Sequence, residues 1–457
     1  MSLIREVRRK GSLIKRFARK KYREIKRWVF ECKKGRLYEK GLPVLSDVVA
    51  SDAGLGADAI CGTAISAEDR YDRNLMALVK MHFNAVTLEN ELKPGAVLGY
   101  YPVCCPADRC RTIMWEGKEL LVPVPDHTNA DRILDIFVKW NRRHPDKRIR
   151  VRGHALVWHA QTPEWFFHED YDKRRPYVSR ELMDRRLQWY IHEMMDYYTA
   201  SDSPYDGLFY GWDVVNDAAS NDSGVWRTDR EPGSDLLTDD WHTAKSGWWA
   251  VYGNEQYVVN AFRYANEYAP ADVKLYYNDH SEWHEQKAQR IISVLRTIRE
   301  HSGPPGKGTR IDGLGLQGHY RVNHPDIQTL RQKIIAYAHE VDHIMITELD
   351  VKAGLSFDGT ENAKKTEYVR QAEYYAALYQ MLRELKHLKG INISGITFWG
   401  VIDSNSWLQK RQEIGGGSDG RKPHCPLLFD ENYKAKPAFW AFADSVIDGN
   451  KEDDSNR

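Results

Sequence analysis

The sequence predicts an α/β fold, a (β/α)8 TIM barrel with long inserted loops and a basic amphipathic N-terminal extension. The first observation is that eight short apolar runs alternate with amphipathic, helix-like stretches from about residue 56 onward. This alternation pairs neighbouring strands in parallel through right-handed crossovers. The second is that no glycine-rich phosphate loop follows the first run, as it would in a doubly wound open sheet. The third is that the alternating part has the length of one barrel with insertions.

The barrel is expected to span residues 46–450 as one domain. Its strands are expected at residues 59–65, 83–89, 148–157, 208–216, 273–278, 311–317, 343–350 and 393–400. Clear amphipathic spacing predicts helices over residues 130–143, 182–198, 255–268 and 367–388. The long segments 94–128 and 219–252 interrupt this alternation, and we expect them to form loops that wall the substrate site.

Residues 1–45 are expected to form a separate, basic extension. Residues 1–40 hold 16 Lys and Arg against 4 Glu and no Asp, and their apolar residues recur at helical spacing. Such a helix packs on its own domain, lies on an anionic membrane surface or binds nucleic acid. We expect no nucleic-acid partner, and peripheral membrane contact stays open. Charges interrupt every apolar run of this segment, unlike in a secretory signal, so a cytoplasmic location is expected.

In a barrel of this kind, chemistry is carried by side chains at the carboxyl ends of the strands. These ends carry carboxylates, amides, histidines and tryptophans. The histidines follow different strands and form no HExxH-like pair, so no metal is expected, and no organic cofactor motif is present. Paired carboxylates with amides and indoles suit glycoside hydrolysis, in which two carboxyl groups flank the scissile bond and the other groups bind sugar.

Six motifs carry a family resemblance in the same order as they occur along the chain. They are RGHALVWHAQTPEW, WDVVND, YYND, IDGLGLQGHY, ITELDV and TFWGVIDSNSWL. Together they resemble the signature of glycoside hydrolase family 10, the retaining endo-β-1,4-xylanases, and the likeness extends from about Gly56 to Ile447. The resemblance implies a TIM barrel that hydrolyses internal β-1,4-xylosidic bonds of xylan or xylo-oligosaccharides with retention and without a cofactor.

The resemblance also implies roles for individual residues. Glu348 resembles the nucleophile, Asp217 stands at the acid/base position, and His319 with Asp350 resembles the relay that orients the nucleophile. Asn216 resembles the amide that holds the sugar 2-hydroxyl, and Asn278 the amide beside the acid/base. The remaining residues that resemble sugar contacts are Glu89, Asn90, Lys93, His154, Trp158, Gln161, Gln317, Trp399 and Trp407.

The chain departs from the family pattern where the chemistry is expected. Asp217 replaces a glutamate and is shorter by about 1.5 Å, and a misplacement of that order costs about 10²-fold in rate. His280 and Ser281 replace a tyrosine and an asparagine, while Ser404 and Asn405 replace a lysine and a tyrosine. Two functions therefore stay open: an endo-xylanase tuned to the shorter acid, or a xylan-binding or xylo-oligosaccharide-binding protein whose acid/base is impaired.

Overall fold

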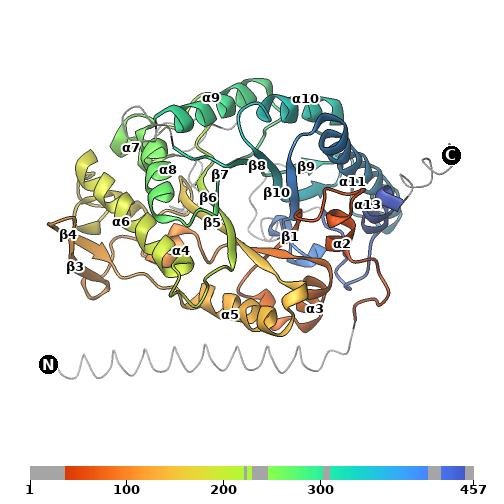
Figure 1. Cartoon of the computed structure of the whole chain (residues 1–457), viewed down its shortest axis with the longest axis horizontal. Coiled ribbons are helices and arrows are strands. Elements are labelled where there is room, and N and C mark those ends of the chain that lie inside the picture. Colours follow the sequence, from red (N-terminus) through yellow and green to blue (C-terminus); the bar gives the residue numbers. More distant parts are fainter. Residues whose placement is uncertain (1–36, 221–223, 229–244, 302–308, 410–423, 448–457) are drawn as a thin grey trace.

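The computed structural model describes residues 37–220, 224–228, 245–301, 309–409 and 424–447. Eight parallel strands follow one another in the order β11-β1-β2-β5-β6-β7-β8-β10, and β10 pairs again with β11, which closes the sheet into a barrel (Figure 1). The strands are β1 (Ile60–Ile65), β2 (Ala85–Leu88), β5 (Arg150–Trp158), β6 (Phe209–Asn216), β7 (Lys274–Asp279), β8 (Gly313–Leu316), β10 (His343–Lys352) and β11 (Ile393–Phe398). The expected (β/α)8 barrel is confirmed.

Helices surround this ring of strands in Figure 1. They are α2 (Leu45–Ala50), α3 (Arg73–His82), α4 (Pro94–Leu98), α5 (Thr128–Arg143), α6 (Arg180–Thr199), α7 (Gly247–Tyr252), α8 (Gln256–Tyr268), α9 (Glu285–His301), α10 (Ile327–Tyr337), α11 (Glu361–Lys389) and α13 (Pro437–Ile447). The four expected helices correspond to α5, α6, α8 and α11. Helix α11 begins six residues earlier than expected, at Glu361, because Thr360 caps it there: its side chain accepts a hydrogen bond from the Ala363 amide.

Local sequence explains why these segments adopt their conformations. The strands are buried on both faces, as in β1, because the barrel interior covers one face and the helices the other. Helix α5 turns Ile133, Leu134 and Phe137 to the core. In β5, Gly153 leaves room for the indole of Trp212, since a Cβ at this position would lie 2.0 Å from that ring. The core therefore depends on a glycine at the β5–β6 contact.

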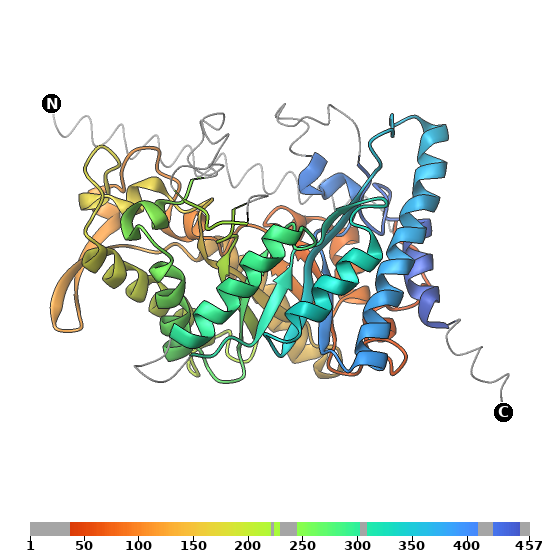
Figure 2. The ribbon, with the colours of Figure 1, turned by 90° about the horizontal axis from the view of Figure 1, so that it is seen from above.

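The two expected inserts differ in how they relate to the barrel. The first contains a hairpin of β3 (Cys110–Trp115) and β4 (Lys118–Pro123), which lies at the end of the molecule opposite α11 in Figures 1 and 2. The second insert is described only in part, and Trp241 lies outside the described residues. Helix α7 of this insert contacts the end of β5: the Trp248 indole N–H donates a hydrogen bond to the Trp158 carbonyl at 3.1 Å.

The basic segment 1–36 lies outside the described residues, so its helical character and its partners stay predictions. The proposed boundary at residues 45 and 46 also stays a prediction, although Leu45 begins α2 and is fully buried against the barrel core. Within the described part of the chain, no helix combines the length and the apolarity needed to cross a membrane. The five cysteines in this part are unpaired thiols.

Candidate active site

The predicted site residues come from the carboxyl ends of five neighbouring strands. Asn216 ends β6 and Asp217 follows it, Asn278 lies in β7, Gln317 follows β8, and Glu348 lies within β10. Parallel pairing aligns these ends, with Trp158 of β5 opposite Asn216 and Asn216 opposite Asn278. The sheet therefore brings side chains that are up to 190 residues apart in sequence to one rim of the barrel.

Glu348 is held as a carboxylate. Its Oε1 accepts a hydrogen bond from Asn278 Nδ2 at 2.8 Å, and its Oε2 lies 3.2 Å from His319 Nε2. Burial alone would raise the pKa of Glu348, but the adjacent His154 and His319 outweigh it, and the pKa falls to about 2. The carboxyl group is therefore ionised across the neutral pH range, as a nucleophile must be.

A second short strand fixes the histidine beside Glu348. Strand β9 (His319–Arg321) pairs with the end of β10 so that His319 lies opposite Asp350, and His319 Nδ1 is 2.9 Å from Asp350 Oδ2. The same Asp350 oxygen accepts from the Trp407 indole at 2.8 Å. Burial opposes the charge on His319, but Asp350 and Glu348 raise its pKa to about 10. The imidazole is therefore protonated and places a positive charge against Glu348.

Asp217 lies in a different environment. Three side chains donate to its carboxyl group at 2.8 Å: Trp158 Nε1 and Asn216 Nδ2 to Oδ2, and Gln317 Nε2 to Oδ1. Its backbone has φ 55°, a left-handed conformation that Asp adopts more readily than most residues. Burial, together with the charge of Asp279, raises the pKa of Asp217 to about 7 despite the opposing charge of Arg227.

A chain of amides joins the two carboxyl groups. Asn278 Nδ2 donates to Glu348 Oε1 at 2.8 Å and also to Asn216 Oδ1 at 2.7 Å. Asn216 in turn donates to Asp217, and Thr347 fixes the Asn278 carbonyl through a 2.6 Å hydrogen bond. The amide orientations are thus determined by the network. The arrangement joins a carboxylate to a carboxyl group of raised pKa, which is the pairing that acid-assisted displacement at a sugar carbon requires.

The predicted sugar contacts on the β2 and β5 side lie around Trp158. Lys93 Nζ is 4.7 Å from the centre of the Trp158 ring and 3.4 Å from Asn90 Oδ1. Gln161 also donates to Asn90 at 3.4 Å, and the buried Gln161 Oε1 atom has no hydrogen-bond partner among the described residues. Burial is the main cause of a lowered pKa for Lys93, which the charge of Glu348 opposes. Glu89 follows β2 at the same rim.

The rings of His154, Trp399 and Trp407 cluster with the ring of His319, the histidine beside Glu348. His154 Nδ1 is 2.9 Å from Asp213 Oδ2, and its ring centre is 5.3 Å from that of Trp399. The rings of Trp399 and Trp407 lie 6.3 and 5.1 Å from His319. His159, which follows β5, is half-buried, and burial, followed by the charge of Arg227, lowers its pKa well below the usual range.

Sequence reasoning missed the charged residues that hydrogen-bond to the site residues or to their neighbours. Asp213, buried in β6, accepts from both Arg152 and His154 and so orients the histidine. Arg227 donates to the Asp217 carbonyl at 2.9 Å. Lys287, fully buried in α9, forms a 2.8 Å ion pair with Asp279. A charged residue in the middle of an otherwise apolar strand, as in WDVVND, was the available signal for Asp213.

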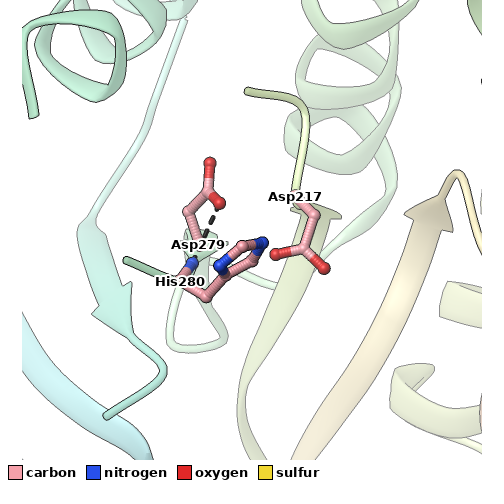
Figure 3. A group of neighbouring side chains, drawn as sticks. All are labelled: Asp217, Asp279 and His280. Atoms are coloured by element: carbon pink, nitrogen blue, oxygen red, sulfur yellow. Dashed lines mark hydrogen bonds between the residues drawn. The ribbon is translucent and has the colours of Figure 1, made fainter. Parts of the chain in front are cut away.

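Asp217, Asp279 and His280 form a compact group whose ligand-type atoms all lie within 4.8 Å of one another (Figure 3). This residue set and spacing would suit a divalent cation. However, Asp279 Oδ1 already accepts from Lys287 and from the His280 amide, and its Oδ2 accepts from the Tyr277 hydroxyl. The Lys287 ammonium thus occupies the position of a cation, and the group does not fit a metal site.

Comparisons with known proteins agree with one another. The model of glycosyl hydrolase family 10 matches residues 51–445. The chain is 32% identical over 422 residues to endo-1,4-β-xylanase Y of Acetivibrio thermocellus, which covers 90% of this chain and 33% of the relative. It is 29% identical over 403 residues to an endo-1,4-β-xylanase of Geobacillus stearothermophilus, with coverage of 87% and 97%.

Solved structures show the same likeness. The CBM22-1 and GH10 modules of endo-1,4-β-D-xylanase 10B from Clostridium thermocellum, complexed with xylohexaose, superpose with a TM-score of 0.67 at 29% identity, covering 91% of this chain and 69% of theirs. TsXylA, an intracellular xylanase from Thermoanaerobacterium saccharolyticum, gives a TM-score of 0.64 at 28% identity, covering 89% and 99%. The chain spans 33%, 51% and 30% of the length of three curated relatives that it matches.

Proposed function

The chain belongs to glycosyl hydrolase family 10, and from this premise we propose that it is an endo-1,4-β-xylanase that cleaves internal xylosidic bonds with retention. The observation that carries the proposal is the pair of carboxyl groups in opposite protonation states. Glu348 has a pKa of about 2 and Asp217 a pKa of about 7, and an amide chain connects them. At neutral or mildly acidic pH, one is a base and the other an acid.

In the first step, the Glu348 carboxylate attacks the anomeric carbon while Asp217 gives its proton to the departing glycosidic oxygen. The C–O bond to the leaving sugar breaks, and an ester bond to Glu348 forms. Positive charge develops on the sugar ring during this step. The protonated His319, held by Asp350, keeps Glu348 ionised and in place until then. Asn216, between the two carboxyl groups, is the candidate partner for the sugar 2-hydroxyl.

In the second step, the Asp217 carboxylate takes a proton from a water molecule whose oxygen attacks the same carbon. The ester bond to Glu348 breaks, and the product leaves with its original configuration. Three hydrogen bonds from Trp158, Asn216 and Gln317 stabilise the Asp217 carboxylate between the two steps. The acid/base thus has the groups needed for its ionised form.

Xylan or xylo-oligosaccharide is the proposed substrate. The relatives are named xylanases, and one of the solved structures is a complex with xylohexaose. The rim carries the residue types that bind neutral sugars, namely the indoles of Trp158, Trp399 and Trp407 for sugar faces and amides for hydroxyl groups. A cytoplasmic location and membrane-surface contact through residues 1–36 are separate predictions that this proposal does not need.

A second candidate function rests on the length of Asp217. A protein that kept its sugar contacts but could not protonate a poor leaving group would bind xylan and hydrolyse it slowly. The three 2.8 Å hydrogen bonds to the Asp217 carboxyl group favour the enzyme, because the surrounding donors already meet the shorter side chain. No rearrangement of the strand end is needed for them to do so.

The test compares the hydrolysis of two kinds of substrate by the full chain. Natural xylo-oligosaccharides have a leaving group that needs a proton, whereas an aryl xylobioside with an acidic phenol does not. We expect hydrolysis of both, with the β-anomer as the first product by proton NMR. Binding of xylohexaose with turnover of the aryl xylobioside alone would favour the weakened-acid candidate. Failure to hydrolyse either substrate would refute the proposed function.

A further inference from the structure

The backbone at Asp217 adopts a conformation that needs support. Its φ of 55° is left-handed, which costs free energy for any residue other than glycine. A residue keeps such a conformation where the surrounding structure holds it in place. The conformation also sets the direction in which the short side chain leaves the backbone, toward Trp158, Asn216 and Gln317. The position of the acid therefore depends on the contacts that hold residues 217–219, the acid turn.

The first two residues of the acid turn are held by β7 and by Arg227. The Asp217 amide donates to the Asn278 carbonyl at 3.0 Å, which continues the pairing of β6 with β7 beyond the end of β6. Arg227 Nε donates to the Asp217 carbonyl at 2.9 Å, and the Arg227 amide donates to the Ala218 carbonyl, also at 2.9 Å. The turn is thus fixed at its start.

The last residue of the acid turn, Ala219, is held at both of its backbone groups. Its carbonyl accepts from Lys287 Nζ at 3.0 Å, and its amide donates to the Tyr277 hydroxyl at 3.2 Å. Asp279 joins these two partners, because it forms a 2.8 Å ion pair with Lys287 and accepts a hydrogen bond from the Tyr277 hydroxyl. The four residues, which we call the Ala219 clamp, are fully buried and form a closed ring of contacts.

The ion pair of the Ala219 clamp is better explained by direction than by stability. Burying an ammonium and a carboxylate costs desolvation free energy, so such a pair often stabilises a fold no more than apolar side chains would. It does fix geometry, because the Asp279 carboxylate holds the Lys287 ammonium where a second N–H meets the Ala219 carbonyl. Figure 3 shows Asp279 and Asp217 at the ends of neighbouring strands. The clamp therefore ties the acid turn to the end of β7.

Strand β7 also holds the nucleophile. Asn278, between the two β7 members of the Ala219 clamp, donates to Glu348 Oε1 at 2.8 Å. Consecutive residues of one strand thus contact the nucleophile and the acid turn. A retaining mechanism needs its two carboxyl groups about 5–5.5 Å apart. Because β7 is the common support, it sets the separation between Glu348 and Asp217.

We propose that Asp279, Lys287 and Tyr277 are positioning residues for the acid/base, which hold the acid turn through Ala219 and so bring the short Asp217 within reach of the leaving oxygen. This inference rests on the role of Asp217 proposed above. The three residues act through the backbone and exchange no proton with the substrate. Their loss should let the left-handed turn relax and move the Asp217 carboxyl group, while the nucleophile stays in place.

The experiment compares xylotetraose with an aryl xylobioside in the full chain carrying Lys287→Met. At about pH 5, Asp217, with its pKa of about 7, is protonated, and removal of Lys287, whose charge lowers that pKa, keeps it protonated. A displaced acid should reduce kcat/KM for xylotetraose by about 10²-fold. The burst of phenol from the aryl xylobioside should slow by less than about threefold, because its leaving group needs no proton.

Lys436→Met is the matched control. Lys436 is likewise buried, forms a 2.9 Å ion pair with Asp403 and donates to the Leu427 carbonyl at 2.7 Å. These residues lie in the segment between β11 and α13, and not at the acid turn. The control should change the two activities by the same factor, as a general loss of stability does.

Tyr277→Phe removes a single hydroxyl group and keeps the ion pair, so it decides the question if Lys287→Met does not fold. It should reduce xylotetraose hydrolysis about fivefold, the equivalent of one hydrogen bond, and again leave the phenol burst nearly unchanged. An equal change of both activities in the folded variants, or no change in either, would overturn the inference and leave the proposed function standing. Failure of the unmutated chain to hydrolyse either substrate would instead refute the proposed function itself.

Discussion

The neighbourhoods of the two carboxyl groups differ in charge and not in burial. Glu348 and Asp217 are each 5% exposed, yet the pKa of Glu348 falls to about 2 while that of Asp217 rises to about 7. Glu348 lies against the protonated His319, whereas Asp217 lies near a second carboxylate, Asp279. Burial raises the pKa of both groups. The comparison teaches that the partner charge decides which carboxyl group is the base and which the acid.

The largest expected effect comes from replacing Glu348, the ionised one of the two carboxyl groups. Glu348→Gln keeps the size of the side chain but has one acceptor oxygen where Glu348 has two, and it cannot form the glycosyl ester. Turnover should fall at least on the order of 10⁴-fold for every substrate, including aryl xylobiosides, because their reaction also passes through the ester. Steady-state kinetics on xylotetraose and on an aryl xylobioside measure this loss. Substantial turnover of either substrate by the folded variant would assign the nucleophile elsewhere.

Replacing Asp217, the protonated carboxyl group, should slow the hydrolysis of xylotetraose much more than the first step on an aryl xylobioside. Asp217→Asn should reduce xylotetraose hydrolysis by about 10²- to 10⁴-fold, the usual contribution of a general acid. The first step on an aryl xylobioside should be much less affected, because its leaving group departs without a proton. A burst of phenol followed by slow turnover, measured by stopped flow, is the expected signature. Equal losses on both substrates would argue against a proton-donor role.

The pH dependence of kcat/KM in the unmutated protein tests the same difference in pKa between Asp217 and Glu348. Asp217 acts while protonated, so kcat/KM for xylotetraose should fall about tenfold per unit as the pH rises above about 7. Glu348 acts while ionised, and its pKa of about 2 leaves it active well below pH 4. Because folding lowers the pKa of Glu348, this residue also adds to the free energy of unfolding. The contribution is present above the pKa that Glu348 has in the unfolded chain, and it is lost as the pH falls toward 2. A high-pH limb shared by Asp217→Asn would contradict the assignment.

The smallest expected effect concerns the length of the acid. Asp217→Glu adds a methylene group that pushes the carboxyl group past its three donors, and Glu tolerates the left-handed backbone at φ 55° less well than Asp. We expect xylotetraose turnover to fall about tenfold, with little change for the aryl substrate. An increase of 10- to 100-fold would show instead that reach limits the native acid.

The sequence determined the fold and predicted which residues gather at the candidate site. The alternation of apolar and amphipathic segments predicted the eight strands to within a few residues at their ends, because strand burial and helix amphipathicity are properties of local spacing. The rule that parallel strands present their carboxyl ends at one rim then gathered Glu348, Asp217, Asn278 and Gln317. The strand-end rule could not predict Arg227 or Lys287, because these residues lie in a loop and in helix α9 and not at the end of a strand.

Only the tertiary structure decided which group each residue meets. His319 reaches Glu348 because β9 pairs with β10 in a register that places His319 opposite Asp350. The opposite protonation of two equally buried carboxyl groups, and the approach of His280 to Asp217, depend on contacts between strands that are distant in sequence. Hydrophobic spacing is encoded within each segment, whereas electrostatic interaction depends on distances of a few ångströms that exist only after the barrel has closed.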